Sequence, residues 1–162
     1  MTKRLILMRH CKSDWSFDLE DHDRPLNPRG LRSAEALGQW LRLNDALPDQ
    51  ILCSSAVRTR ETCEWLGLTV APELRADLYL ADPEAMLTAL RQASGDTVLM
   101  IGHNPGIGWL AHLLAAQPPV HERFDDYPTG ATLVAEFPIT DWGDLSPGSG
   151  EVVDFITPRE LI

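Results

Sequence analysis

Two arginines and two histidines in the sequence stand directly or shortly after short apolar runs. They are Arg9, His10, Arg58 and His103. Arginine offers a planar fork of N–H donors that matches the oxygens of a phosphate group, and a neutral imidazole is a nucleophile. The carboxyl ends of the strands in an open α/β sheet line a common crevice, where residues distant in the chain converge. The four side chains therefore predict a small cationic pocket for a tetrahedral dianion.

The elements that would position these side chains can be read from the hydrophobic pattern. Short apolar runs without a polar face are expected to be buried strands, and stretches with apolar residues three or four positions apart are expected to be helices. The expected strands cover residues 4–8, 51–53, 97–101, 131–137 and 151–156. Four helices are expected. The first begins at Pro28 and is stopped by Pro48, and the second follows the strand 51–53 and ends at about Leu66. The third begins at Asp82-Pro83, and the fourth covers residues 107–116.

Capping residues are expected at the ends of several helices. Asn27 and Asp82 each precede a proline, an arrangement typical of a helix start. Ser54 or Ser55 is expected to cap the second helix, and Gly67 is expected to end it. The N-termini of helices that follow strands would add oriented N–H groups to an anion pocket.

The order of these elements predicts the fold. Strands alternate with helices in most of the chain, and the last two strands are joined by a Gly/Pro/Asp-rich turn, 141–150, which indicates an antiparallel hairpin. Both features fit a three-layer α/β/α sandwich with a mixed, mostly parallel central sheet. No repeat or linker interrupts the sequence, so we expect a single domain over residues 1–162.

The composition limits the classes of function. Of the 162 residues, 44% are hydrophobic and 23% charged, which is typical of a folded globular protein rather than a disordered one. A net charge of −10 repels polyanions, so we expect neither nucleic acid nor a membrane as a partner. Three cysteines without a CxxC pair are typical of free thiols in a reducing compartment. We expect a cytoplasmic protein and a monomer.

The residues around the first arginine and histidine resemble a known family. Residues 5–10, Leu-Ile-Leu-Met-Arg-His, are similar to the opening signature of the histidine phosphatase superfamily, an apolar strand that runs into Arg-His-Gly. Further matches follow in the order of the family at residues 23–27, 29–30, 54–58, 61–62, 98–106 and 154–158. The short chain, without a large insertion, resembles most the SixA-type phosphohistidine phosphatase branch.

This resemblance implies a phosphoglycerate mutase-like fold and a role for each site residue. His10 would be the nucleophile that becomes transiently phosphorylated, and Arg9 and Arg58 would bind the phosphoryl oxygens. His103 would stabilise the transferring group, and Asn104 would contact the substrate. The resemblance implies a metal-independent hydrolase of phosphate monoesters or phosphoramidates that needs no cofactor. Its substrate would be a protein phosphorylated on histidine or a small phosphorylated molecule.

The sequence departs from the signature at Cys11, which stands where the family usually has glycine. We expect this thiol to fill space, the alternative being a site sensitive to oxidation. The general acid stays open among seven carboxyl residues: Asp14, Asp18, Asp21, Asp23, Asp77, Asp82 and Glu84. Phosphohistidine leaves as imidazole, a far better leaving group than an alkoxide, so a weak P–N bond in the substrate would make a missing acid tolerable.

Other functions are compatible with parts of the sequence. A non-catalytic module that binds phosphorylated ligands on the same scaffold would not need two histidines. A metal site could be built from Asp21-His22-Asp23 with His10 or His103, but the spacing of paired metal ligands is missing. A mutase would need a lid over its substrate, for which the short chain leaves little room.

Overall fold

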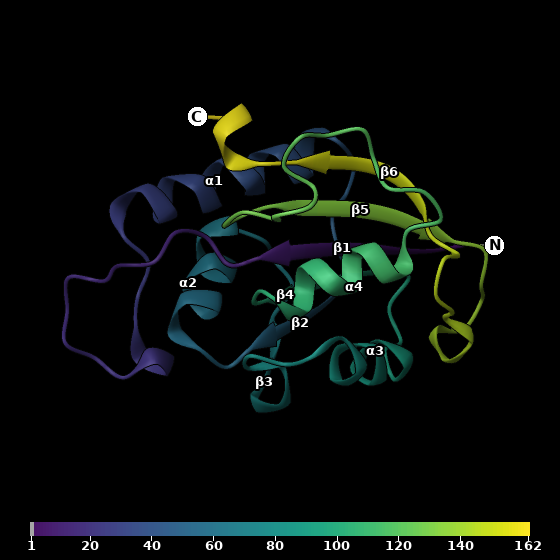
Figure 1. Ribbon diagram of the computed structural model, residues 1–162, viewed down its shortest axis with the longest axis horizontal. Coiled ribbons are helices and arrows are strands. Elements are labelled where there is room, and N and C mark those ends of the chain that lie inside the picture. Colours follow the sequence, from purple (N-terminus) through teal and green to yellow (C-terminus); the bar gives the residue numbers. More distant parts are fainter. Residues whose placement is uncertain (1) are drawn as a thin grey trace.

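The order of helices and strands follows the alternation expected from the sequence (Figure 1). The computed structural model describes residues 2–162. The strands are β1 (Lys3–Arg9), β2 (Gln50–Ser54), β3 (Pro72–Arg75), β4 (Thr97–Gly102), β5 (Thr132–Phe137) and β6 (Glu151–Ile156). The helices are α1 (Pro28–Leu43), α2 (Val57–Leu66), α3 (Pro83–Arg91) and α4 (Gly106–Leu114). Short 3-10 helices cover Asp21–Asp23, Ala76–Leu78, Trp142–Asp144 and Pro158–Glu160.

The strands form one sheet in the order β3-β2-β4-β1-β5-β6. The pairs among β1 to β4 are parallel, whereas β5 runs antiparallel to both β1 and β6. The expected mixed, mostly parallel sheet with a C-terminal antiparallel hairpin is therefore confirmed. The register places Arg9 beside Gly102 and Cys53 beside Ile101, so the carboxyl ends of β1, β4 and β2 lie next to one another.

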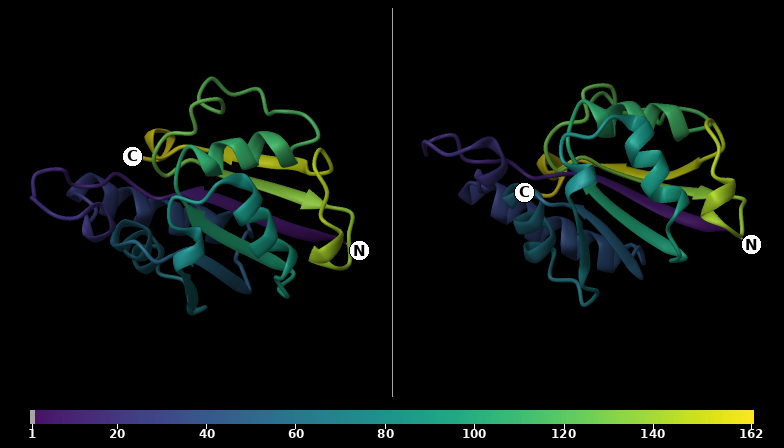
Figure 2. Two further views of the ribbon diagram at one scale, coloured as in Figure 1. Left: turned by 60° about the horizontal axis from the view of Figure 1, so that its bottom comes forward. Right: turned by 90° about the horizontal axis from the view of Figure 1, so that it is seen from below.

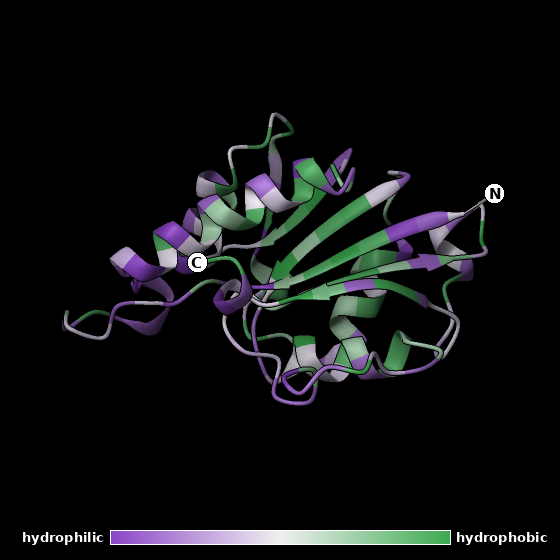
Figure 3. Ribbon diagram, turned by 90° about the horizontal axis from the view of Figure 1, so that it is seen from above, coloured by the Kyte–Doolittle hydropathy of each residue, from purple (hydrophilic) through white to green (hydrophobic). Residues whose placement is uncertain are grey.

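Helices cover both faces of the sheet (Figure 2). On one face, Leu37 of α1 and Leu66 of α2 share a buried cluster with Ile6 of β1. On the other face, α3 and α4 contribute Leu90 and Leu110 to a second buried cluster. Figure 3 shows the hydrophobic residues concentrated along the central strands between these layers. The three-layer α/β/α architecture expected from the sequence is confirmed.

Most of the expected helix ends are confirmed. The side chain of Asn27 accepts a hydrogen bond from Gly30 N at 2.8 Å, and that of Asp82 accepts one from Ala85 N at 2.8 Å. Gly67 ends α2 in the left-handed region with φ 70°. The prediction that Ser54 or Ser55 caps the second helix was wrong, because α2 begins at Val57, with Ala56 at the capping position and no side-chain cap.

Two further boundaries differ from expectation. β3 has no counterpart among the expected strands, because its four residues are mostly exposed at the edge of the sheet and give no apolar run. The last helix ends at Leu114 rather than at residue 116. Among residues 2–162, no helix is both long and apolar enough to cross a membrane.

Candidate active site

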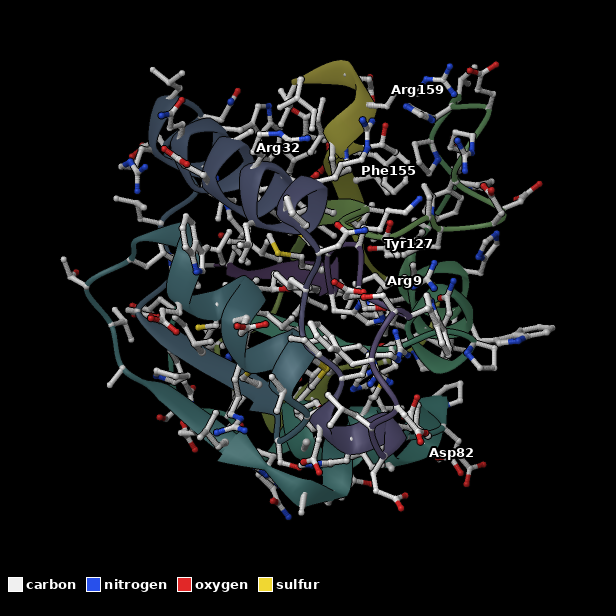
Figure 4. All side chains as sticks on the ribbon, turned by 90° about the vertical axis from the view of Figure 1, so that its left-hand side faces the viewer. Arg9, Arg32, Asp82, Tyr127, Phe155 and Arg159 are labelled. Atoms are coloured by element: carbon white, nitrogen blue, oxygen red, sulfur yellow. The ribbon has the colours of Figure 1, made fainter. Side chains whose placement is uncertain are left out.

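The sheet register brings the predicted site residues together at one end of the molecule. His10 follows β1 and His103 follows β4, and these strands are direct neighbours. The two imidazole rings lie with their centroids 5.3 Å apart. Arg58 lies in the first turn of α2, the helix that follows β2 at the same end of the sheet. Figure 4 shows this end of the molecule, with Arg9 labelled.

A pocket of about 310 Å³ lies at this end of the sheet. It is lined by all five residues expected to form the site: Arg9, His10, Arg58, His103 and Asn104. Six residues with no predicted role complete the lining: Lys12, Ser13, Trp15, Arg24, Leu80 and Thr129. Within the described part of the chain, no carboxylate lines this pocket. The site is therefore cationic, as the sequence predicts.

His10 is held in one tautomer by the backbone. Its Nδ1 lies 2.7 Å from the carbonyl oxygen of Cys11, and since a carbonyl only accepts hydrogen bonds, Nδ1 must carry the proton. The lone pair is then on Nε2. Burial lowers the pKa of His10 well below 6.5, the bond to Cys11 opposes this shift, and the positive charges of Arg9 and Arg58 add to it. His10 is therefore a neutral imidazole with a free nitrogen at neutral pH.

His103 is also neutral at this pH. It is 1% exposed, and its Nε2 lies 2.8 Å from the hydroxyl of Ser54, the last residue of β2. Burial, and next the positive charge of Arg58, lower its pKa to about 3. Its Nδ1 is buried and has no hydrogen-bond partner among the described residues. The Ser54 contact replaces the helix cap expected of that serine.

The arginines are fixed by bonds that leave part of each guanidinium unengaged. Arg58 is 3% exposed and donates from Nη1 to the backbone oxygen of Asp21 at 2.7 Å and from Nη2 to its carboxylate at 3.0 Å. Arg9 donates from Nη1 to the carbonyl of Tyr127 at 3.2 Å. The Nε atoms of both arginines have no partner in the part of the chain that the structure describes. Two fixed cations thus face the same pocket as the two imidazoles.

Asp21 connects Arg58 with a second buried arginine, Arg24. The Asp21 carboxylate accepts from Nη2 of Arg24 at 3.1 Å and also accepts a hydrogen bond from the hydroxyl of Tyr79. The Tyr79 bond is the largest cause that holds the pKa of Asp21 well below its usual range, and the bonds from Arg24 and Arg58 add to it. The guanidinium of Arg24 stacks 3.6 Å above the ring of Trp15. Asp21 therefore orders the wall of the pocket without lining it.

The comparisons with known proteins point to one family. Residues 5–82 match the profile of the histidine phosphatase superfamily (branch 1). An uncharacterized Mycobacterium tuberculosis protein is 36% identical over 94% of this chain and 100% of its own length. The phosphohistidine phosphatase SixA of Escherichia coli is 29% identical over 72% of this chain and 77% of its own length. A solved structure from Nakamurella multipartitia, a proposed phosphohistidine phosphatase SixA, superposes with a TM-score of 0.86 at 30% identity, covering 98% of this chain and 97% of its own.

The chain belongs to the histidine phosphatase superfamily. The fold expected from the resemblance, that of phosphoglycerate mutase-like proteins, is confirmed, and the protein is a phosphatase. The resemblance to the SixA branch is confirmed as well.

This histidine phosphatase has site residues that the sequence did not single out. Arg24 belongs to the matched segment 23–27, and its place in a family segment directly before a helix was the signal available. Tyr79 gave no comparable signal, because it directly follows a short 3-10 helix that has no hydrophobic periodicity. Asp21 was one of seven candidate acids, and none of the seven lines the pocket.

Two other residues of this histidine phosphatase are engaged in the structure. The thiol of Cys11 is fully buried, and burial raises its pKa to about 12, which favours a packing role over an oxidation-sensitive one. The side-chain amide of Asn104 donates to the carbonyls of Asp126 and Tyr127 at 3.1 and 2.9 Å, and its oxygen accepts from Gly108 N. Its substrate contact stays a prediction.

The metal-site alternative placed Asp21 among the ligands. In the structure the Asp21 carboxylate accepts hydrogen bonds from Arg58 and Arg24 instead. Among the described residues, no group of three or more ligating side chains has the geometry to hold a metal ion. A divalent cation placed here would also be repelled by these two guanidinium groups.

Proposed function

We propose that this phosphatase hydrolyses a phosphohistidine or another phosphoramidate by way of a covalent phosphohistidine at His10. The observation that carries the proposal is the convergence of His10, His103, Arg9 and Arg58 on one pocket without a carboxylate. The names of the SixA relatives support phosphohistidine as the substrate. A module that only binds phosphate would have no use for an imidazole whose free nitrogen is fixed by the backbone.

The first step transfers the phosphoryl group to His10. Nε2 of His10 attacks phosphorus as the P–N bond of the substrate breaks, and the electron pair of that bond stays on the leaving nitrogen. When the other nitrogen of the substrate ring carries a proton, the leaving group is neutral imidazole. Arg9 and Arg58 stabilise the charge on the phosphoryl oxygens. The Nδ1–H of His10 gives its carbonyl partner on Cys11 a stronger hydrogen bond as the ring gains positive charge.

In the second step, water attacks phosphorus, the bond to Nε2 breaks, and phosphate leaves with His10 restored. His103 lies beside His10 and is neutral before phosphate binds. A phosphoryl dianion offsets the charge of Arg58 that helps to lower the pKa of His103, so its ring can take up positive charge next to the transferring group.

The composition of the pocket favours a substrate whose leaving group needs no strong acid. Expulsion of an alkoxide from an ordinary phosphate ester benefits from a positioned acid, and no carboxyl group among the described residues lines this pocket. Imidazole leaves as a neutral base and takes any further proton from solvent. The pocket is therefore better suited to a P–N bond than to an alkyl phosphate.

Trapping of the intermediate tests the mechanism. Brief reaction with a ³²P-labelled phosphoramidate, followed by alkaline quench, is expected to leave label on the wild-type protein and none on His10→Ala. His121→Ala, which removes a histidine outside the pocket, serves as the matched control and should retain the label. Equal labelling of the wild type and His10→Ala would overturn the assignment of the nucleophile, and turnover without any label would refute the covalent route.

A substrate comparison tests the leaving-group argument. We expect kcat/KM for a phosphohistidine peptide or for phosphoramidate to exceed that for an alkyl phosphate by several orders of magnitude. A clear preference for the alkyl ester would refute the proposal, because it would require an acid that the pocket does not contain.

A further inference from the structure

A second, smaller recess of about 160 Å³ opens beside the phosphate pocket. Lys12 and Thr129 line both, so the two spaces adjoin. The recess is also lined by Arg29 from the start of α1, by Arg159 from the C-terminal 3-10 helix, and by Arg123 from the segment before β5. In Figure 4, Arg159 and Arg9 both lie on the face of the molecule that is turned to the viewer.

The recess is strongly cationic in an acidic protein. Four of the 14 lysines and arginines of the chain line the recess: Lys12, Arg29, Arg123 and Arg159. No carboxylate of the described residues lines it. Arg123 pairs with Asp126 at 2.9 Å. None of the ion pairs formed within residues 2–162 involves the other three cations. Lys12, Arg29 and Arg159 are exposed to solvent, and a recess lined by charges of one sign raises the local concentration of anions.

The frame of the recess is well ordered by local bonds. The carbonyl of Lys12 accepts from Asn27 N at 3.0 Å, which fixes the Lys12 segment to the start of α1. Thr157 and Glu160 form a capping box that holds the 3-10 helix bearing Arg159. Ser33 is 4% exposed and also lines the recess. These bonds fix the backbone that carries Lys12, Arg29 and Arg159 around the recess.

We infer that this recess is a subsite for a second anionic group of the substrate, a phosphate or a carboxylate. The inference rests on the proposed function, since it assumes that the phosphoryl group occupies the adjoining pocket. The recess has room for one small anionic group, and Arg29 and Arg159 offer planar donor forks to its oxygens. The substrate class is then a phosphorylated molecule or peptide with a second negative group near the phosphoryl group.

The test compares ligands with one and two anionic groups on the wild type and on the double variant Arg29→Ala/Arg159→Ala. If the second anionic group belongs to a small molecule, calorimetry should show tighter binding of propane-1,3-bisphosphonate than of propylphosphonate, neither of which has a cleavable bond. If it belongs to a protein, a phosphohistidine peptide with aspartate beside the phosphohistidine should have a lower KM than the same peptide with asparagine there. We expect the wild type to prefer the two-anion ligand in at least one arm, and the double variant to lose about three- to tenfold of that affinity.

Arg32→Ala is the matched control, because Arg32 is an exposed arginine of α1 that does not line the recess. It should keep the preference, and all three proteins should turn over phosphoramidate, which has one anionic group, at the same rate. The inference is overturned if neither arm shows a preference or if the double variant retains it. Because phosphonate binding needs no catalysis, this result is independent of whether the covalent mechanism is correct.

Discussion

The charge of His103 depends on its burial and on the arginines beside it. Its pKa is lowered from 6.5 to about 3 in the folded chain, first by burial and then by Arg58. The unfolded chain therefore binds one more proton between these two values, and the free energy of unfolding falls as the pH drops from about 6.5 to about 3. This stability is fully present above pH 6.5, where both states are neutral at this residue.

His103→Gln should make stability less sensitive to acid. Glutamine does not titrate and can still form a hydrogen bond with Ser54. Between pH 6 and 4, the wild type should therefore lose more unfolding free energy than His103→Gln, by at most about 1.4 kcal/mol per pH unit. Urea titrations at several pH values measure this. Parallel curves for the two proteins would show that His103 is protonated equally in the folded and unfolded states.

Asp21 is a positioning residue for the two arginines of the pocket wall. Asp21→Asn keeps the size of the side chain but weakens its bonds to Arg58 and Arg24. It also leaves the pocket more positive, so phosphate binding should not weaken while kcat falls about tenfold. Asp23→Asn is the control, because Asp23 carries the same charge in the same 3-10 helix and contacts only His22 at 3.7 Å among the ion pairs. A rise in KM at constant kcat would contradict the positioning role.

The sequence could place three of the pocket residues because the ends of strands are marked by hydrophobicity. Arg9, His10 and His103 stand where buried strands finish, and parallel pairing then brings those ends together. Asp21 and Tyr79 could not be found in this way. Asp21 lies in one 3-10 helix and Tyr79 directly follows another, and no periodicity in the sequence determines how these two short segments meet.

At the scale of elements, the same distinction explains the helix boundaries. Asn27 and Asp82 cap their helices as predicted, because each meets a backbone N–H in its own first turn. Ser54 does not cap α2, because its hydroxyl contacts His103, a residue distant in the sequence. Serine before a helix is a common cap, but the Ser54 hydroxyl forms its tertiary contact with His103 instead.

Substitutions at two glycines of α1 distinguish the contribution of this helix to the site from its contribution to stability. A Cβ at Gly30 would lie 2.1 Å from the carbonyl oxygen of Lys12, and one at Gly38 would lie 2.0 Å from that of Leu66. Gly30→Ala and Gly38→Ala should each destabilise the protein by about 1–3 kcal/mol, because a backbone must shift in both. Only Gly30→Ala moves the Lys12 segment, so only this variant should raise KM when both are assayed well below their Tm. Equal KM values would contradict this role of α1.

At the scale of the whole molecule, the sheet lies between the two hydrophobic clusters and contributes residues to both of them. Alternate residues of β1 belong to different clusters: Leu5 and Leu7 to one, Ile6 and Met8 to the other. The sequence predicts this strand as buried on both faces, but not which helices cover each face, since that depends on the strand order β3-β2-β4-β1-β5-β6. We propose on this basis that residues 1–162 fold as one domain.

A single cooperative unfolding transition is the expected consequence. Leu7→Ala and Ile6→Ala remove side chains from opposite clusters, and each should lower the stability of the whole protein by about 2–5 kcal/mol. The wild type and both variants should show calorimetric and van't Hoff enthalpies that agree. If the two faces were independent units, each substitution would split the transition and shift only one of the resulting steps. Because β1 supplies both clusters and pairs with β4 and β5, loss of either cluster should release the central strand and with it the other face.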